Sequence, residues 1–213
     1  MSAGFVVPRS PRSRSRVLLT YLGLAAWAGL CVVLGAYLLA GHLLTLPTPA
    51  AADPALHQAI AANRHADQRD RWLVLHVLSE DCKCSRRVLD HLLADRRPSG
   101  VVERIVLVTD HGAAELGAAI RARGFELDVV TPDELVARYH VEAAPLLVVV
   151  DPHDDVRYVG GYTPRKQAAD MRDVFVIAAI RRGDTVEPLP AFGCAVGRAL
   201  STKLDPFGIR FRN

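Results

Sequence analysis

Hydrophobic residues are concentrated near the N-terminus, where no charged side chain occurs from Val17 to Gly41. An α-helix rises about 1.5 Å per residue, so about 20 apolar residues cross a hydrocarbon layer of about 30 Å. A helix of this length without a polar face is uncommon in the core of a soluble domain. The pattern therefore predicts a single transmembrane helix over residues 17–44.

The two flanks of this run differ in charge. Several arginines precede it, and the first acidic residue of the chain is Asp53. Basic residues favour the cytoplasmic side, so we expect residues 1–16 to form a cytoplasmic basic tail and the rest of the chain to be exported. A cleaved signal peptide is the alternative, but its apolar stretch would be only about 7–15 residues long. The small residues at positions 48–52 leave a cleavage site open, and we favour an uncleaved anchor.

The polar segment after the anchor contains Pro47, Pro49 and Pro54, followed by alanine-rich and charged sequence. Such a composition is typical of a spacer. We expect residues 45–70 to be a linker with at most one short surface helix, and the folded domain to begin near Arg71.

Strand-length apolar runs and helical patterns alternate through the rest of the chain. The runs cover residues 72–78, 105–108, 127–130, 145–150 and 156–160, of which the last two read as a hairpin. Helical patterns occupy the intervals after the first three runs and residues 166–181. This order predicts an α/β domain with a mixed sheet, over residues 71–182.

Two of the helical patterns carry specific signals. Thr131, Pro132 and Glu134 form a helix start in which Thr131 caps and Glu134 completes a capping box. In the last helix, four apolar residues recur at i, i+3, i+4 and i+7, which places them on one face: Met171, Val174, Phe175 and Ala178. Val176, Ile177 and Ile180 widen this apolar surface, so the periodicity is not sharp.

Candidate chemistry begins with Cys82-Lys83-Cys84, which follows a buried strand and opens a helix. The thiolate is the reactive form of cysteine, so a reactive pair needs a lowered pKa. The helix N-terminus and Lys83 favour the thiolate, whereas Glu80 and Asp81 oppose it unless Asp81 caps the helix. A disulfide between cysteines this close closes a small ring, which we expect to be easily reduced.

The order of these parts resembles the plan of the thioredoxin-like superfamily. The best-matching stretch runs from Tyr139 through Pro145 and an apolar strand to Asp151, followed by Gly160-Gly161. With its anchor, the chain is similar to membrane-tethered thiol–disulfide proteins of the bacterial envelope. Those proteins usually carry Cys-x-x-Cys, whereas this chain has Cys-x-Cys.

The resemblance implies a thioredoxin-like mixed sheet flanked by helices and preceded by one transmembrane helix. It also implies that Pro145 is cis, lies beside the cysteines and leaves a backbone edge for a substrate peptide. The expected location is the bacterial inner membrane, crossed once, with the domain periplasmic or extracellular.

Beyond the resemblance, residues 183–213 contain many prolines and glycines, and we expect a loop-rich extension packed on the domain. Cys194 lies here, and three interpretations remain open: a resolving or relay cysteine near Cys82 and Cys84, a thiol that pairs with an external partner, or a buried inert thiol. Cys31, inside the anchor, is expected to be a packing residue. His76 is expected to be a core or rim histidine, and Glu126 and Asp128 simple strand-edge charges.

Composition excludes some functions. The net charge of +3 is too small to indicate a nucleic-acid surface. The sequence has no glycine-rich phosphate loop, no Ser/His/Asp pattern and no paired Cys-x-x-Cys zinc spacing, so no cofactor is expected.

The leading hypothesis is an enzyme, a thiol–disulfide oxidoreductase acting on exported thiol or disulfide proteins. Cys82 would attack, Cys84 would resolve, Pro145 would shape the substrate edge and Cys194 could relay. The alternatives are a Cu(I)-binding or copper-delivery protein, with Cys82, Cys84 and either Cys194 or His76 as ligands, and a non-catalytic interaction module.

Overall fold

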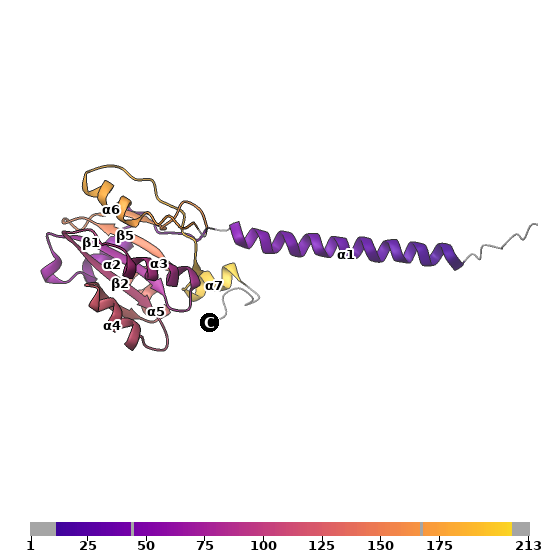
Figure 1. The fold of residues 1–213 in the computed structure, drawn as a ribbon, viewed down its shortest axis with the longest axis horizontal. Helices are drawn as coiled ribbons and strands as arrows, with labels where there is room; N and C mark the ends of the chain where they lie inside the picture. Colours follow the sequence, from indigo (N-terminus) through magenta and orange to yellow (C-terminus); the bar gives the residue numbers. More distant parts are fainter. Residues whose placement is uncertain (1–11, 44, 167, 206–213) are drawn as a thin grey trace, which may run out of the picture. The chain divides into compact units, whose positions relative to one another are not determined.

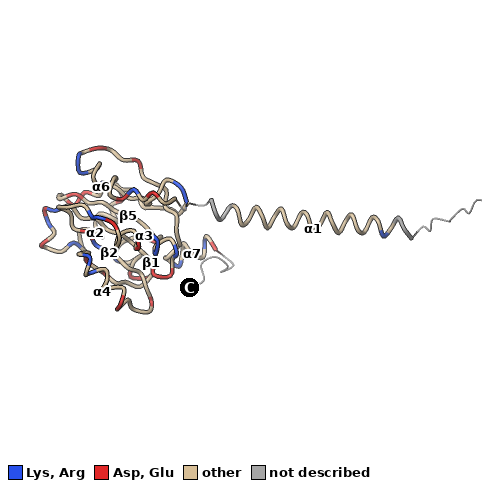
Figure 2. The backbone as a smooth tube through the Cα atoms, viewed as in Figure 1, with Lys and Arg blue, Asp and Glu red and all other residues tan. Residues whose placement is uncertain are grey.

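The computed structural model describes residues 12–205 except residues 44 and 167, and the chain divides into two units, residues 1–44 and 45–213. Helix α1 (Arg12–Leu43) forms the first unit, and its stretch from Ser15 to Leu39 is long and apolar enough to cross a membrane. Side chains 17–39 are all exposed, so α1 is not a core helix. Figure 2 shows no charge along α1 from Val17 to Leu39, whereas charges of both signs are spread over the second unit.

The second unit is built on a five-stranded mixed sheet with the order β3-β2-β1-β5-β6 (Figure 1). The strands are β1 (Trp72–Ser79), β2 (Val101–Val108), β3 (Glu126–Val130), β5 (Leu146–Val150) and β6 (Val156–Gly160). β1, β2 and β3 are parallel, whereas β5 and β6 are antiparallel to their neighbours. β1 and β5 are buried on both faces, which explains their nearly unbroken apolar sequences.

Helices cover both faces of this sheet. One face packs against α3 (Lys83–Ala94), α4 (Ala114–Ala122) and α6 (Asp173–Arg181). The other face packs against α2 (Pro54–Asn63), α5 (Pro132–Tyr139) and α7 (Arg198–Leu204). The strand order, the two helix layers and a cis peptide bond before Pro145 together give the expected thioredoxin-like α/β fold.

Residues 45–70 pack as part of the folded unit, which corrects the expectation of a linker. Leu56 and Ile60 of α2 are each only 1% exposed and belong to the core on the α5 side of the sheet. The backbone N–H of Leu46 donates to the carbonyl of Ala191 at 2.8 Å. The signal for this packing was the spacing of Leu56 and Ile60, which lie one turn apart on the same face of a helix.

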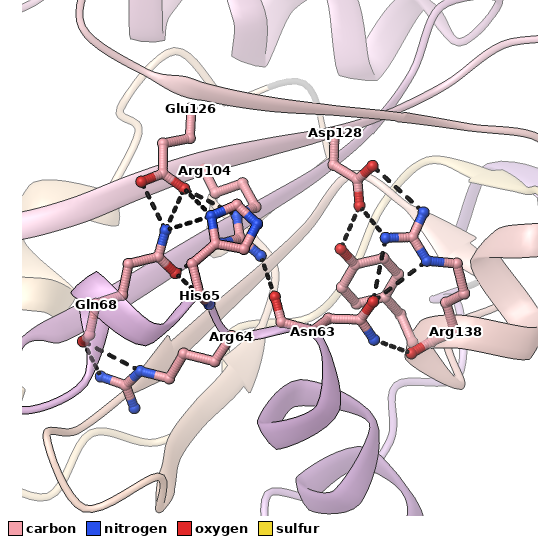
Figure 3. Close-up of polar contacts among 9 residues, drawn as sticks. Asn63, Arg64, His65, Gln68, Arg104, Glu126, Asp128 and Arg138 are labelled. Atoms are coloured by element: carbon pink, nitrogen blue, oxygen red, sulfur yellow. Dashed lines mark hydrogen bonds and ion pairs between the residues drawn. The ribbon is translucent and has the colours of Figure 1, made fainter.

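A polar network also holds this segment to the sheet (Figure 3). Gln68, the last residue of the short 3-10 helix η1 (Ala66–Gln68), donates to Glu126 at 2.5–2.6 Å, and Arg104 pairs with Glu126 at 3.1 Å. Arg138 pairs with Asp128 at 2.7 Å. Glu126 and Asp128 are therefore more than strand-edge charges, because they join α5 and the segment after α2 to β2 and β3.

The start of α5 confirms the predicted capping box. The backbone N–H of Glu134 donates to the Thr131 hydroxyl at 3.3 Å, and the N–H of Thr131 donates to the Glu134 carboxylate at 2.7 Å. Thr131 thus satisfies one of the N–H groups that a helix start leaves without a partner inside the helix.

Helix α6 differs from its prediction in both its start and its face. It begins at Asp173, and its buried residues include Asp173, Val176, Ile177 and Ile180, whereas Phe175 is 59% exposed. Val176, Ile177 and Ile180, predicted to widen the apolar surface, are buried, but the predicted centre of that surface at Phe175 was wrong. The inward face is turned toward Asp173, which is buried through ion pairs. The true inward face therefore contains a charged residue that hydrophobic periodicity counts as polar.

Candidate functional site

The Cys-x-Cys pair lies where β1 ends and α3 begins. Cys82 occupies the N-cap position in an extended conformation, and its carbonyl accepts the N–H of Arg86 at 3.0 Å. The cap residue is therefore Cys82, not Asp81. The hydroxyl of Ser85 accepts the N–H of Ser79 at 3.0 Å, which fixes the turn between the strand and the helix.

The short strand β4 (Ala143–Ala144) and the cis Ala144–Pro145 bond lie beside this helix start. Cys82 Sγ is 3.8 Å from the carbonyl oxygen of Ala144, to which it donates when protonated. Pro145 and Cys84 line one small pocket. The expectation that Pro145 is cis and adjacent to the cysteines is confirmed.

Cys194 reaches the same place from the C-terminal segment. The strand β7 (Cys194–Ala195) pairs antiparallel with β4, and Cys194 lies opposite Ala144. Cys82 Sγ is therefore close to the strand that carries Cys194, because it contacts the carbonyl of Ala144. The thiols of Cys194 and Cys84 are also near enough to lower the pKa of Cys82. All four cysteines are free thiols in this structure, and the three outside α1 converge, in the positions that a resolving or relay role requires.

The three converging thiols differ in access to solvent. Cys82 is only 1% exposed, whereas Cys84 and Cys194 are partly exposed. The pocket beside Cys84 is lined mainly by apolar side chains, including Tyr162, Met171 and Phe192. Solvent therefore has more access to Cys84 and Cys194 than to Cys82.

Hydrogen bonding within the cluster determines where its charge lies. The pKa of Cys82 is lowered far below its ordinary value of 9.0, first by the hydrogen bond from Cys194 and then by that from Cys84, although burial opposes the shift. The same bonds to Cys82, together with burial, raise the pKa of Cys84 and of Cys194. Because the titrations are coupled, the first proton leaves the cluster easily and later protons are held.

The cation that acts on the thiols is not the one expected from the sequence. Lys166 lowers the pKa of both Cys84 and Cys194, and Arg87 lowers that of Cys84, without reversing the upward shifts. Lys83 is exposed and is not among the main influences on any of the three thiols. Since Lys166 is far from the cysteines in sequence, only the folded chain brings its charge to the site.

His76 lies in the middle of β1 and is completely buried. One ring nitrogen is 2.8 Å from the Tyr162 hydroxyl, and the other is 3.1 Å from Glu103. Both nitrogens are therefore occupied within the core. This confirms the interpretation of His76 as a core histidine and removes it as a copper ligand.

The polar network around His76 was missed in the sequence. Arg97 pairs with Glu103 at 2.5 Å and with Asp173 at 2.8 Å, and His91 contacts Asp173 at 2.8 Å. Burial raises the pKa of Asp173, but the hydrogen bond from His91 and the charge of Arg97 outweigh it and hold the pKa well below 3.8. The sequence signal for this network was Asp173 itself, which precedes the buried Val176, Ile177 and Ile180 at the i, i+3, i+4 and i+7 spacing of one helix face.

Two other features bear on the competing hypotheses. Among the described residues, no group of three or more His, Cys, Asp or Glu side chains is placed to hold a metal ion. A groove of about 810 Å³ between α3 and α4 is lined by residues such as Leu78, Glu80 and Leu116, but by none of the candidate site residues.

Comparison with known proteins gives distant structural likeness only. No protein-family model matches the chain, and no curated protein matches it in sequence. The chain is similar to an uncharacterized conserved protein from Geobacillus kaustophilus, with TM-score 0.48 and 18% identity over 61% of this chain and 78% of that one. A hypothetical protein from Sinorhizobium meliloti gives TM-score 0.48 and 16% identity over 73% of this chain and 91% of that one. A thiol-disulfide isomerase from Corynebacterium glutamicum gives TM-score 0.39 and 20% identity over 59% of this chain and 90% of that one.

Proposed function

We propose that this protein is a membrane-tethered thiol–disulfide oxidoreductase that acts on exported proteins through Cys82 and Cys84. The observation that supports it most is the convergence of Cys82, Cys84 and Cys194 beside Pro145 at the start of α3, with the negative charge held on Cys82. A thiol with a lowered pKa is ionised at neutral pH and is also a good leaving group.

The proposed reaction is a two-step exchange. The Cys82 thiolate attacks one sulfur of a partner disulfide, and the partner's other sulfur leaves as a thiolate that takes up a proton. Cys84 then loses its proton and attacks Cys82 Sγ, forming the Cys82–Cys84 bond and releasing the partner's second sulfur. Two electrons pass from the protein to the partner, and the reverse sequence oxidises a partner dithiol.

The surroundings of the pair are suited to a protein partner. The pocket beside Cys84 offers apolar contacts from Tyr162, Met171 and Phe192, which would receive a side chain next to the partner's cysteine. Pro145 lines the same pocket and would contact that side chain.

The proposed location is the bacterial inner membrane. Helix α1 is long enough to cross it, and the arginines that precede the apolar run favour a cytoplasmic N-terminus. The domain would then face the periplasm or the outside, where disulfides persist. Protease added to intact spheroplasts should digest residues 45–213 of the expressed full-length chain. Protection until the membrane is lysed would contradict this orientation.

An exchange assay tests the proposed activity. The full-length protein in detergent is reduced, freed of reductant and mixed with a disulfide-bonded model protein, whose released thiols are counted. Cys82→Ser should abolish exchange, and the control Cys31→Ser should behave as wild type. The double variant Cys84→Ser/Cys194→Ser, which lacks both neighbouring thiols, should accumulate the mixed disulfide. Full activity in Cys82→Ser would refute the proposal. Tight Cu(I) binding without exchange would instead support the copper alternative.

A further inference from the structure

The backbone edge beside Pro145, expected to be open to a substrate peptide, is occupied by the protein itself. β7 pairs with β4, so that Ala195 lies opposite Ala143 and Cys194 opposite Ala144. The pairing continues beyond the strand, because the N–H groups of Val196 and Gly197 both donate to the carbonyl of Glu142, at 2.7 and 3.0 Å. We call residues 190–197 the C-terminal strap.

Two glycines allow the strap to approach this closely. A Cβ atom on Gly193 would lie 2.0 Å from the carbonyl oxygen of Ala144 and 2.5 Å from Cδ of Pro145. A Cβ atom on Gly161 would lie 2.1 Å from the carbonyl oxygen of Pro190. Real side chains are never this close to a backbone oxygen, so both positions accept only glycine while the strap is in place.

The strap also brings a cysteine to the reactive sulfur. Cys194 lies opposite Ala144, whose carbonyl oxygen is 3.8 Å from Cys82 Sγ, and Cys82 is almost completely buried in this closed arrangement. An extended segment that pairs with the edge before Pro145 and presents a cysteine to Cys82 has the features that the proposed reaction requires of a protein substrate.

We infer that the C-terminal strap is a built-in substrate strand, and that a Cys82–Cys194 disulfide locks it over the site until reduction and displacement of the strap admit an external protein. This inference rests on the proposed function and adds to it a regulatory step. It also gives Cys194 the role of an internal reaction partner.

The locking step is a thiol–disulfide exchange within the cluster. In the Cys82–Cys84 disulfide, the thiolate of Cys194 attacks Cys82 Sγ, so that the Cys82–Cys194 bond forms as the Cys82–Cys84 bond breaks. The electron pair leaves on Cys84, which takes up the proton lost by Cys194. No net oxidation occurs. A partner dithiol, itself becoming a disulfide, reduces the lock to two thiols.

Disulfide mapping of the wild-type full-length protein is the first test. The protein in detergent is oxidised with oxidised glutathione, its remaining thiols are alkylated, and its peptides are analysed by mass spectrometry. The expected product links Cys82 to Cys194 and carries the alkyl group on Cys84. Alkylated Cys194 in the fully oxidised protein would overturn the inference. This test needs no variant, so a folding defect cannot obscure it.

Displacement of the strap is the second test. Gly193→Val keeps the thiol but cannot keep the contact with Ala144, so the alkylation of Cys82 in the reduced protein should accelerate by about tenfold or more. Glu187→Val is the matched control, because Glu187 is exposed and lies outside the strap. An unchanged Cys82 rate in a folded Gly193→Val variant would overturn the inference.

The exchange assay separates the two proposals. If the strap shields the site, Gly193→Val should exchange with the model protein faster than wild type. Equal rates in wild type and in the folded variant would overturn the strap but retain the oxidoreductase. No exchange in either protein, with a Cys82–Cys194 link by mass spectrometry, would overturn the oxidoreductase and retain the strap as a structural lock.

Discussion

Two clusters of titratable groups in this domain show opposite ways of handling charge. In the network of Figure 3, Arg104 is 3% exposed, and its guanidinium donates to Glu126 at 3.1 Å, to Gln68 at 2.6 Å and to the carbonyl of Asn63 at 2.8 Å. At the start of α3, by contrast, three thiols meet, and the nearby cations Lys166 and Arg87 do not reverse the upward pKa shifts of Cys84 and Cys194. The first cluster pairs its buried cation with an anion, whereas in the second the negative charge on Cys82 is stabilised chiefly by two neighbouring thiols.

The difference teaches where reactivity can reside. A buried charge whose hydrogen bonds and ion pairs are all satisfied by fixed neighbours stabilises a single arrangement of those side chains. A thiolate stabilised chiefly by neighbouring thiols can exchange those thiols for a partner's sulfur at little cost. The completed network stabilises the fold, and the negative charge on Cys82 makes the cysteine site reactive.

The largest expected effect comes from breaking the completed network. Arg104→Met should lower the free energy of unfolding by about 3 kcal/mol, because it leaves Glu126 and the Asn63 carbonyl without their buried donor. Urea unfolding followed by circular dichroism measures this. The alkylation rate of Cys82 should not change, and a change would show that the two clusters are coupled.

The second network, around Asp173, should show a pH signature. The lowered pKa of Asp173 means that its stabilising contribution is complete above pH 3.8 and is lost as the pH falls from there through the folded pKa. Asp173→Asn should therefore lower stability at neutral pH by about 2 kcal/mol and weaken the loss of stability in acid. Urea unfolding at a series of pH values tests this. An unaltered pH dependence would mean that Asp173 does not carry the effect.

The smallest expected effect concerns the charge on Cys82. Cys84→Ala removes the second largest of the hydrogen-bonding effects that lower the pKa of Cys82, so that pKa should rise by about one unit, equivalent to about 1.4 kcal/mol. The pH dependence of Cys82 alkylation, followed by mass spectrometry, measures the shift. A matched Cys31→Ala variant should leave the profile unchanged. A downward shift would contradict the proposed direction of the hydrogen bond.

Much of the fold could be predicted from local pattern, and the failures have a common cause. The strands of the central sheet and the capping box of Thr131 depend on residues close in sequence, and both were found. The packing of α2 on the sheet and the burial of Asp173 in α6 were not predicted, because both depend on the distant residues that pack against these helices. Asp173 is buried and Phe175 exposed only because Arg97 and His91 meet Asp173.

The sequence by itself determined an apolar helix near the N-terminus, an α/β order of elements and a cysteine pair at a helix start, because each is encoded in consecutive or regularly spaced residues. Only the tertiary structure decided that Cys194 lies against Cys82 and that the edge beside Pro145 is already occupied. A thiol's pKa and a strand's partner both depend on atoms adjacent in space, and the spacing of residues along a chain does not specify which distant segments will meet.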